Sequence, residues 1–467
     1  MKPSPDSPLG GLLARQIRDR AEVEAIRSES ENLSLSFRRL DERIQQWAAL
    51  LGGAGLGPEE AAALSTGNVA AFPELFFALR SLGTPVLSLD TGLRPEGARE
   101  VCRRMGARRI LHRDSGLGGD PIEGAPDPSV RLLDLGHVEP PPAGTALVKL
   151  TSGSTVDPRG ACFTEEALVQ GIENIREGMD IGPSDRVLVA IPLSHSYGFD
   201  NGVLSLAAAG TALILQPDIL PAALLQTMRD RAVTFFPAVP TLIRALSRSA
   251  WPRNLALRRV ICASAPLAPE IAGDFAQSSG RRVHQFFGAT ECGGISFERS
   301  PGETGAAGTV GLPLPGVRIE LAGEGEVRIH SAANRFALLP RSSDLPPYVE
   351  TGDRAELSPE GRLRLLGRTR PLANIAGFKI DLTTIDIFLR GLPGVDDAVA
   401  LAVEDPMRGQ RIVAYVETTA HTPAALLELC RSRLSAREVP GEIRVSDRLP
   451  RNPRGKLDRA ALLEAAR

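Results

Sequence analysis

The sequence has few aromatic residues and no excess of charge of either sign. Trp, Tyr and Phe make up 4% of the 467 residues, and the formal net charge at pH 7 is −2. A surface that stacks nucleobases needs aromatic side chains, and a surface that attracts nucleic acid or anionic lipid needs a positive field. The composition therefore argues against a nucleic-acid-binding protein and against attraction to an anionic membrane.

Paired cysteines and long apolar runs are also missing. The five cysteines are scattered without a CxxC pair, so neither a disulfide framework nor a zinc site is indicated, and a reducing cytoplasm fits best. The first ten residues, MKPSPDSPLG, lack the apolar core of a signal peptide, and no apolar run reaches the ~18 residues of a membrane-spanning helix. We expect a cytoplasmic protein without membrane insertion, and the sequence does not indicate its oligomeric state.

The hydrophobic pattern predicts an α/β fold with two domains. Short apolar runs alternate with helical stretches, which indicates βαβ units and a largely parallel sheet. We expect a large N-terminal domain of such sheets at residues 1–366 and a small mobile α+β domain at 367–467. The predicted strands of the large domain lie at residues 61–64, 85–89, 109–111, 146–150, 160–163, 187–191, 213–215, 234–236, 260–262 and 282–287.

Three stretches depart from this alternation. Residues 12–51 have a helical pattern of apolar and charged residues, and residues 115–143 are rich in Gly, Pro and Asp, as is typical of a loop. From about residue 308, Gly and Pro separate short strands at 317–321, 327–330 and 363–366, which predicts a β-rich subdomain within the large domain.

The most informative stretch is Thr151–Gly160, which reads TSGSTVDPRG. Small glycine and hydroxyl residues let backbone N–H groups converge on an anion, and Arg159 adds a positive fork that suits phosphate. The loop joins two predicted strands, and a helix is expected to begin only after Thr164 as N-cap. It is therefore not a P-loop, which runs from strand to helix and contains GxxxxGK[ST]. By itself the stretch is equally compatible with a flexible surface turn.

Several further motifs match one family in the order in which they occur. These motifs are Phe287–Glu291, Gly311–Val317, Thr351–Asp353, Gly367–Arg368, Gly377–Ile380 and Leu449–Lys456. In chain order, the first three resemble the family's aromatic-G-x-T-E, GxPxPGV and TGD motifs, and the last resembles LPxxxxGK. The fourth and fifth resemble the start and the end of the element that lies between TGD and LPxxxxGK. Residues 151–160, which we call the hydroxyl loop, resemble TSGSTGxPKG. The chain thus resembles, over nearly its whole length, the ATP-dependent adenylate-forming (AMP-binding) superfamily. This superfamily includes acyl- and aryl-CoA synthetases, adenylation domains of peptide synthetases and firefly-type luciferases.

The resemblance implies roles for particular residues. A carboxylate attacks the α-phosphorus of ATP, so two anions must be brought together by positive charge and positioning. The implied catalytic residues are Lys456, Glu291 as the Mg²⁺ ligand, Thr290, and His195 at the acyl pocket. The implied ATP-binding residues are Thr151, Ser152, Gly153, Ser154, Thr155, Arg159, Gly288, Asp353 at the ribose and Arg368. Without the resemblance, Glu291 and Lys456 would be read as solvated charges, Asp353 as a turn residue and His195 as a loop histidine.

The small domain of this family rotates about a hinge, here near Arg370, and then presents a second face. Gly377 and Lys379 would then meet the thiol cofactor, CoA or a pantetheine. Four features depart from the family pattern. Val156 stands in place of Gly, Arg159 in place of Lys, and Arg370 in place of the hinge Asp or Lys, and residues 381–386 lack the family's Pro and first Glu. A β-branched residue resists positive φ, so Val156 implies a remodelled loop.

Ser196 stands where peptide-synthetase domains place an Asp for the substrate amine, so we expect a fatty or aryl acid without an α-amine. The expected pocket walls are residues 192–201, 263–266 and 286–294, whose side chains are mostly small or apolar. Three functions remain open. The first is an acyl-CoA ligase, the second is a ligase that loads an acyl carrier protein or stops at the adenylate, and the third is a degenerate member that binds without turnover.

Overall fold

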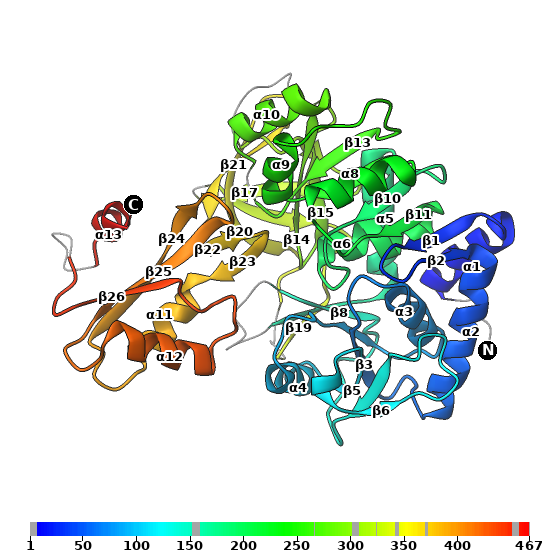
Figure 1. Cartoon of the computed structure of the whole chain (residues 1–467), viewed down its shortest axis with the longest axis horizontal. Helices are drawn as coiled ribbons and strands as arrows, with labels where there is room; N and C mark the ends of the chain where they lie inside the picture. The colour runs from blue at the N-terminus through cyan, green and yellow to red at the C-terminus, as the bar shows by residue number, and fades with distance from the viewer. Residues whose placement is uncertain are drawn as a thin grey trace. The chain divides into compact units, whose positions relative to one another are not determined.

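The computed structural model describes residues 7–151, 159–265, 267–300, 308–323, 325–340, 345–368, 372–450 and 457–466. Contacts divide the chain into two compact units, which are Met1–Thr151 with Arg159–Leu366 and Gly367–Arg467. Figure 1 shows the larger unit in blue to yellow and the smaller one in orange to red. We describe each unit by itself.

The first sheet of the larger unit contains nine of the described strands and is parallel in its centre. Hydrogen bonds join β14, β13, β12, β10, β11 and β1 in parallel, and antiparallel strands complete both edges. The strands follow in the order β16 (Leu312–Pro313), β15 (Gly293–Phe297), β14 (Val283–Ala289), β13 (Arg259–Cys262), β12 (Phe235–Ala238), β10 (Arg186–Val189), β11 (Ala212–Leu215), β1 (Glu24–Ser28) and β2 (Leu33–Ser36).

The second sheet contains eight of the described strands, with a parallel centre formed by β8, β4, β3 and β5. Its order is β19 (Ala337–Leu339), β9 (Gly160–Phe163), β8 (Leu147–Leu150), β4 (Val86–Ser88), β3 (Ala61–Ser65), β5 (Ala107–His112), β7 (Arg131–Asp134) and β6 (Asp120–Pro121). Each of the two sheets therefore combines parallel βαβ units with antiparallel edge strands, as expected for an α/β fold.

Helices form layers on both faces of these sheets, because the strands alternate their side chains between two cores. Val187 and Val189 of β10 face the core between the sheets, whereas Leu188 faces the outer core under helices α8–α10. The central layer holds α1 (Pro8–Arg20), α2 (Phe37–Gly53), α3 (Ala71–Ser81), α5 (Glu165–Met179) and α7 (Ser205–Ala209). The outer helices are α8 (Pro221–Asp230), α9 (Pro240–Ser247) and α10 (Pro269–Ser279) on the first sheet and α4 (Pro95–Arg104) on the second.

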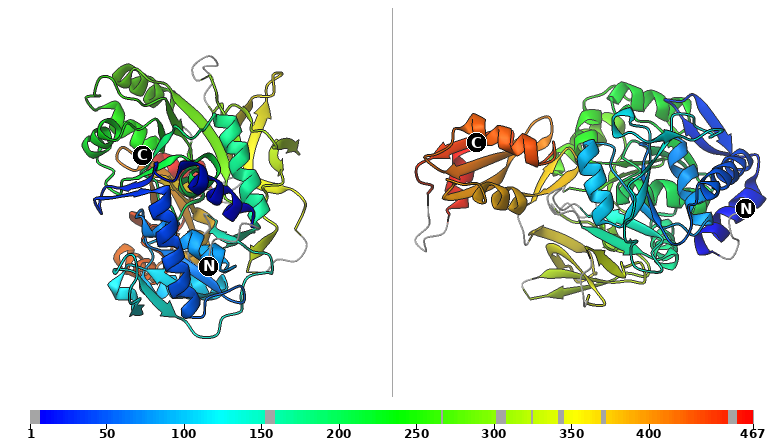
Figure 2. Two further views of the ribbon diagram at one scale, coloured as in Figure 1. Left: turned by 90° about the vertical axis from the view of Figure 1, so that its right-hand side faces the viewer. Right: turned by 90° about the horizontal axis from the view of Figure 1, so that it is seen from below.

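A four-stranded sheet of described strands, coloured yellow in Figure 2, completes the larger unit. Its order is β17 (Arg318–Ala322), β18 (Glu326–His330), β20 (Val349–Leu357) and β21 (Leu363–Arg368). Its buried face includes Val327, Ile329 and Val349 and packs against Phe287 and Cys292 of the β14–β15 hairpin. This sheet is the β-rich subdomain that the sequence predicts.

The smaller unit is a five-stranded sheet with helices on both faces, as far as its described residues go. The strands are β23 (Phe378–Asp381), β22 (Leu372–Ile375), β25 (Gly409–Glu417), β24 (Asp397–Asp405) and, beside β25, β26 (Glu442–Ser446). Helices α11 (Leu382–Arg390) and α12 (Pro423–Arg433) pack on one face, and α13 (Arg459–Ala465) packs on the other. The α/β class and the division into a large and a small part agree with the expected fold.

Two sequence predictions about local structure are wrong. Residues 12–51 are not continuously helical, because the hairpin β1–β2 lies between α1 and α2. Residues 115–143 are not all loop, because β7 pairs with β5 at the edge of the second sheet. The β1–β2 hairpin is stabilised because β1 pairs with the distant strand β11, and β7 is stabilised by pairing with β5 near the sheet edge. The local hydrophobic pattern of the sequence does not reveal either pairing.

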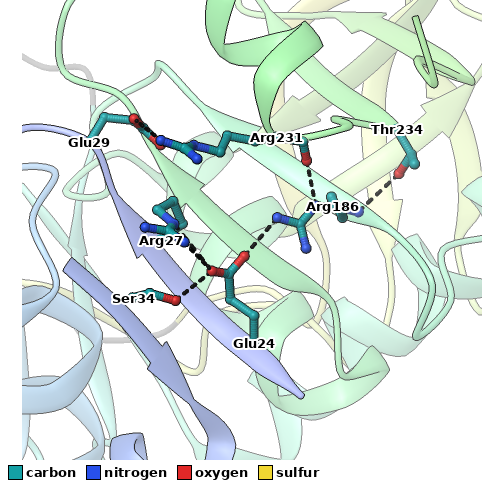
Figure 3. A network of polar contacts seen from close by, with 7 residues as sticks. All are labelled: Glu24, Arg27, Glu29, Ser34, Arg186, Arg231 and Thr234. Carbon is teal, nitrogen blue, oxygen red and sulfur yellow. Dashed lines mark hydrogen bonds and ion pairs between the residues drawn. The ribbon is translucent and has the colours of Figure 1, made fainter. Parts of the chain in front are cut away.

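A polar network fastens the β1–β2 hairpin to the first sheet (Figure 3). Arg186 of β10 donates from Nη2 to Glu24 Oε1 at 2.7 Å, and Ser34 Oγ donates to Glu24 Oε2 at 2.5 Å. Arg231, which follows α8, holds Glu29 through two hydrogen bonds of 2.6 and 3.1 Å. The hairpin is thus attached by charge as well as by its strand pairing.

Candidate functional site

The hydroxyl loop begins and ends on two paired strands. β8 and β9 are antiparallel, with Leu150 opposite Gly160, and the Thr151 N–H donates to the Arg159 carbonyl at 2.9 Å. Thr151 is half-buried and Arg159 is exposed. The predicted strands before and after this stretch are confirmed as β8 and β9, and so is the predicted helix start, because the Thr164 side chain caps α5 by accepting from the Ala167 N–H.

Thr290 and Glu291 lie in the tight turn of the β14–β15 hairpin. The Cys292 N–H donates to the Ala289 carbonyl at 3.2 Å and closes this turn. Gly288 is required by close approach, because a Cβ at this position would lie 2.7 Å from the Gly293 carbonyl oxygen. Both Thr290 and Glu291 are half-buried, so their side chains are held without being sealed from solvent.

One short segment connects the hairpin turn to the strand that leaves the hydroxyl loop. The Arg335 N–H donates to the Glu291 carbonyl at 2.9 Å, and the next N–H, of Phe336, donates to the Cys162 carbonyl of β9 at 3.0 Å. The segment then continues as β19, which pairs with β9 as far as Gly160. The Glu291 turn and the end of the hydroxyl loop are therefore fixed to the same piece of backbone.

Asp353 approaches the same region from the four-stranded sheet. It lies on β20 and is 7% exposed, and its N–H donates to Thr351 Oγ1 at 3.2 Å. Cys292, next to Glu291, is buried in the core that β20 helps to form. Burial raises the pKa of the Cys292 thiol, and the negative charges of Glu291 and Asp353 raise it further.

His195 precedes the short helix α6 (Ser196–Phe199) at the end of the β10 strand. Its Nε2 lies 3.8 Å from Asp90 Oδ2, and its side chain is 40% exposed. The loop is fixed by Asn68, which follows β3 of the other sheet. Asn68 donates to the Ile191 carbonyl at 2.9 Å and accepts from the Leu193 N–H at 2.8 Å. The carboxyl ends of strands from both sheets therefore meet here, where ligands of open α/β folds bind.

A buried ion pair lies behind these elements. Lys149 of β8 is 4% exposed and its Nζ donates to Asp200 Oδ1 at 2.6 Å, and Asp200 is 8% exposed. Burial raises the pKa of the Asp200 carboxyl, while the neighbouring Lys149 ammonium acts to lower it. Asp200 begins a single π-helical turn, Asp200–Leu204, a rare geometry that is frequent at functional sites.

Sequence reasoning missed this pair. Lys149 lies inside an apolar run that predicts a strand, and Asp200 lies in a stretch that we expected to be mostly small or apolar. A lysine in the middle of a buried strand was the available signal, because a buried charge needs a partner. Asp200 adds one buried, paired charge to residues 192–201, a stretch that we expect to be mostly small or apolar.

The predicted thiol-cofactor residues lie in the smaller unit. Gly377 has φ +90° between β22 and β23, and its N–H donates to Asn374 Oδ1 at 3.0 Å. Lys379 is on β23, opposite Asn374 of β22. Arg368 ends β21, and its side chain lies outside the described residues. Also outside the described residues are Ser152, Gly153, Ser154, Thr155, Val156, Arg370 and Lys456.

The described residues suit a magnesium ion that is coordinated mainly by substrate phosphates and water. They contain no cluster of three or more His, Cys, Asp or Glu side chains that could enclose a metal. Mg²⁺ in phosphate-handling enzymes is held by one or two carboxylates plus substrate phosphates and water. Glu291, a single half-buried carboxylate in a fixed turn, suits that role.

No described helix is long and apolar enough to cross a membrane.

The layered fold and the matched family profiles define an adenylate-forming enzyme, and the chain belongs to the AMP-binding enzyme family. The family profile "AMP-binding enzyme" matches residues 13–331, and "AMP-binding enzyme C-terminal domain" matches residues 385–456. A probable CoA ligase of Humulus lupulus is 27% identical over 98% of this chain and 96% of its own length. The sulfoacetate–CoA ligase of Cupriavidus necator is 30% identical over 77% of this chain and 76% of its own.

Solved structures share the fold. The amide bond synthetase of Marinactinospora thermotolerans superposes with a TM-score of 0.83 at 22% identity, covering 97% of this chain and 99% of its own. The o-succinylbenzoate CoA synthetase of Bacillus subtilis, in a double-mutant form, also gives a TM-score of 0.83 at 22% identity, covering 97% and 98%. The resemblance to the adenylate-forming superfamily is confirmed.

Proposed function

We propose that this enzyme is an AMP-forming acid–thiol ligase. It activates a fatty or aryl acid without an α-amine as the acyl-adenylate and then transfers the acyl group to a thiol, most readily CoA. The observation that carries the proposal is the backbone connection at residues 335 and 336. It fixes the Glu291 turn to the strand that leaves the hydroxyl loop.

The chemistry of the first step accounts for the residue types. The carboxylate attacks the α-phosphorus and pyrophosphate leaves, so negative charge must be neutralised and the two anions aligned. In our proposal the N–H and hydroxyl groups of residues 151–155 hold the β- and γ-phosphates, and Asp353 accepts from the ribose hydroxyls. Mg²⁺ bound at Glu291 would neutralise phosphate charge. Lys456 would stabilise the charge that develops on the oxygens around phosphorus.

The choice of acid class rests on Ser196 and Asp200. Ser196 carries no charge with which to bind an α-ammonium group. Asp200, four residues later, is already paired with Lys149 at 2.6 Å. An amino acid would therefore lack a carboxylate partner among the described residues of this wall.

CoA is favoured as the thiol by the curated relatives. Their names include ligases that form CoA esters of sulfoacetate, oxalate and ferulate, together with a tripeptide synthetase. Gly377 and Lys379 are the residues that we propose for thiol binding. A carrier-protein pantetheine is the alternative acceptor, and the same enzyme assayed with CoA and with a pantetheinylated carrier separates the two.

ATP–pyrophosphate exchange with a panel of fatty, aryl and amino acids tests the first step. We expect exchange with one class of non-amino acid, and a fall of ~10²–10³-fold in Lys456→Ala and Glu291→Gln, since each removes a group that acts on developing charge. Exchange that persists in Lys456→Ala would contradict the role of that lysine. A folded protein that binds ATP but exchanges with no acid would instead be a degenerate binding member of the family.

A further inference from the structure

The buried ion pair between Lys149 and Asp200 stands in apolar surroundings. The Lys149 Nζ lies 5.1 Å from the ring centre of Phe163 and 5.6 Å from that of Phe199. Leu168 and Ile172 of α5 line the same space. Both charges are thus removed from bulk water and set among aromatic and aliphatic side chains.

Such a pair is a poor device for stability. The cost of taking two charges out of water offsets most of their attraction, and well-packed apolar residues of similar volume often stabilise a fold as well or better. Phe163, Leu168 and Ile172, which line the space beside the pair, are apolar, so an apolar pair would continue this lining. A reason beyond packing is therefore needed for two charges at this position.

A small cavity adjoins the pair. Its volume is about 10 Å³, which is room for about one water molecule or one hydroxyl group. Lys149, Asp200, Leu204 and Gly293 are among the residues that line it. Asp200 and Gly293 belong to two of the three stretches that we propose as walls of the acid pocket. The cavity therefore lies where two of those walls meet.

The pair has hydrogen-bonding capacity directed toward this space. An ammonium group has three N–H donors, and the ion pair with Asp200 Oδ1 uses one. The other carboxylate oxygen, Asp200 Oδ2, faces Gly293, because a Cβ built on that glycine would lie 3.9 Å from it. A donor and an acceptor thus stand side by side at a cavity of hydroxyl size.

We propose that Lys149 and Asp200 form the polar end of the acid pocket and select an acid with a neutral hydroxyl group remote from its carboxylate. The inference rests on the proposed function. A hydroxyl is both donor and acceptor, so it donates to Asp200 while it accepts from Lys149. A second carboxylate on the substrate would be repelled by Asp200, and an ammonium group would be repelled by Lys149. An unsubstituted acid leaves the pair without a partner in the cavity.

Wild-type enzyme provides the first test. Pyrophosphate exchange is measured with matched acids that differ only at the remote end, as aryl acids and straight-chain acids with hydrogen, hydroxyl, carboxylate or amino substituents. We expect kcat/KM for the hydroxy acid to exceed that of its unsubstituted partner by at least ~10-fold, because a site built to bond a hydroxyl rejects the analogue that lacks it. Equal or lower values for the hydroxy acid would overturn the proposal, and so would a preference for a charged substituent.

The second test replaces both charges by apolar residues of similar size, Lys149→Met with Asp200→Leu. The double variant is chosen because a single change leaves the other charge buried and unpaired, which threatens folding. We expect the ratio of kcat/KM between hydroxylated and unsubstituted acid to fall toward one. General damage lowers both values and leaves their ratio unchanged, so an unchanged ratio would overturn the proposal.

A matched control replaces another buried pair. Arg80 and Glu165 lie 2.8 Å apart, with side chains 13% and 7% exposed. Arg80→Met with Glu165→Leu should leave the ratio as in wild type. If this control shifts the ratio equally, the selectivity does not reside in Lys149 and Asp200. Absence of exchange with every acid would refute the proposed function itself, and the inference with it. Exchange without hydroxyl preference would refute the inference alone.

Discussion

At the scale of single residues, several partners together stabilise the ionised form of the Glu24 carboxyl. Partial burial acts to raise the pKa of this carboxyl. Hydrogen bonds from Ser34 and Arg186, with the charges of Arg186 and Arg27, outweigh burial and place the pKa below its ordinary value. A depressed carboxyl pKa means that the charged form stabilises the fold. This contribution is complete above the unfolded-state pKa and is lost as the pH falls through the folded-state pKa.

Glu24→Gln should therefore lower the free energy of unfolding by about 1 kcal/mol at pH 7, since one carboxylate with charged partners near the surface is lost. At ~pH 3 the difference from wild type should shrink, because the wild-type carboxyl is itself becoming protonated. Urea unfolding at the two pH values measures both. A difference that is the same at both would show that the charge of Glu24 does not contribute.

Gly288 offers a test of the hairpin turn that carries Thr290 and Glu291. In Gly288→Ala the new methyl would meet the Gly293 carbonyl oxygen at 2.7 Å, so the turn must move. Small displacements of catalytic groups cost up to ~10²-fold in rate, and we expect a fall of at least ~10-fold in exchange activity.

The matched control is Gly97→Ala, where a new methyl has no atom within 4 Å. We expect this control to keep wild-type exchange. Full activity of Gly288→Ala would mean that the turn tolerates the displacement, or that Thr290 and Glu291 do not act in the reaction.

At the scale of elements, Asn68 joins the two large sheets. It follows β3 of the second sheet and bonds the backbone of the segment after β10 of the first. Its two shorter hydrogen bonds satisfy the Ile191 carbonyl and the Leu193 N–H, and a third, of 3.5 Å, reaches the Val189 carbonyl. The segment after β10 is thus positioned by a side chain more than a hundred residues away in sequence.

Asn68→Ala should lower the free energy of unfolding by about 2 kcal/mol, since two backbone groups lose their partner. It should also raise KM for the acid more than it lowers kcat, because the segment that we propose as a wall of the acid pocket loses these hydrogen bonds. Urea unfolding and exchange kinetics measure the two effects. Gln46→Ala removes an exposed side-chain bond to Gly124 and serves as control. A loss of stability with unchanged KM would confine Asn68 to a structural role.

At the scale of the whole molecule, the two units have separate cores. The buried clusters of the larger unit contain no residue beyond Leu363, and those of the smaller unit begin at Ala373, within the described residues. In the smaller unit, Asp386 accepts from the Ala400 N–H at 2.6 Å and from Arg459 Nη2 at 2.8 Å. It joins α11, β24 and α13 within that unit alone.

Separate cores predict two thermal transitions. Asp386→Ala should lower the midpoint of the smaller unit's transition while leaving the larger unit's transition in place, because it strands a buried N–H and an arginine. Differential scanning calorimetry distinguishes the two transitions, and Glu428→Ala at an exposed pair is the control. A single transition that shifts as a whole would show that the units unfold together.

Local sequence by itself determined the elements whose signals are contained in a few residues. The short apolar strands, including those on either side of residues 152–158, and the cap at Thr164 follow from periodicity and capping chemistry. The motifs and their order indicated the family by resemblance, and the matched family profiles confirm it.

Tertiary structure alone decided what depends on contacts between distant segments. The β1–β2 hairpin is stable because β1 pairs with β11, nearly two hundred residues away. The local sequence of the hairpin does not contain this partner, and its pattern by itself predicted a helix. Residues 335 and 336 connect the Glu291 turn to β9 through backbone hydrogen bonds. A sequence motif of side chains does not predict such a connection. Lys149 and Asp200 become a pair only when β8 packs against the turn after α6. Neither residue alone reveals a partner, because burial and proximity are properties of the folded chain.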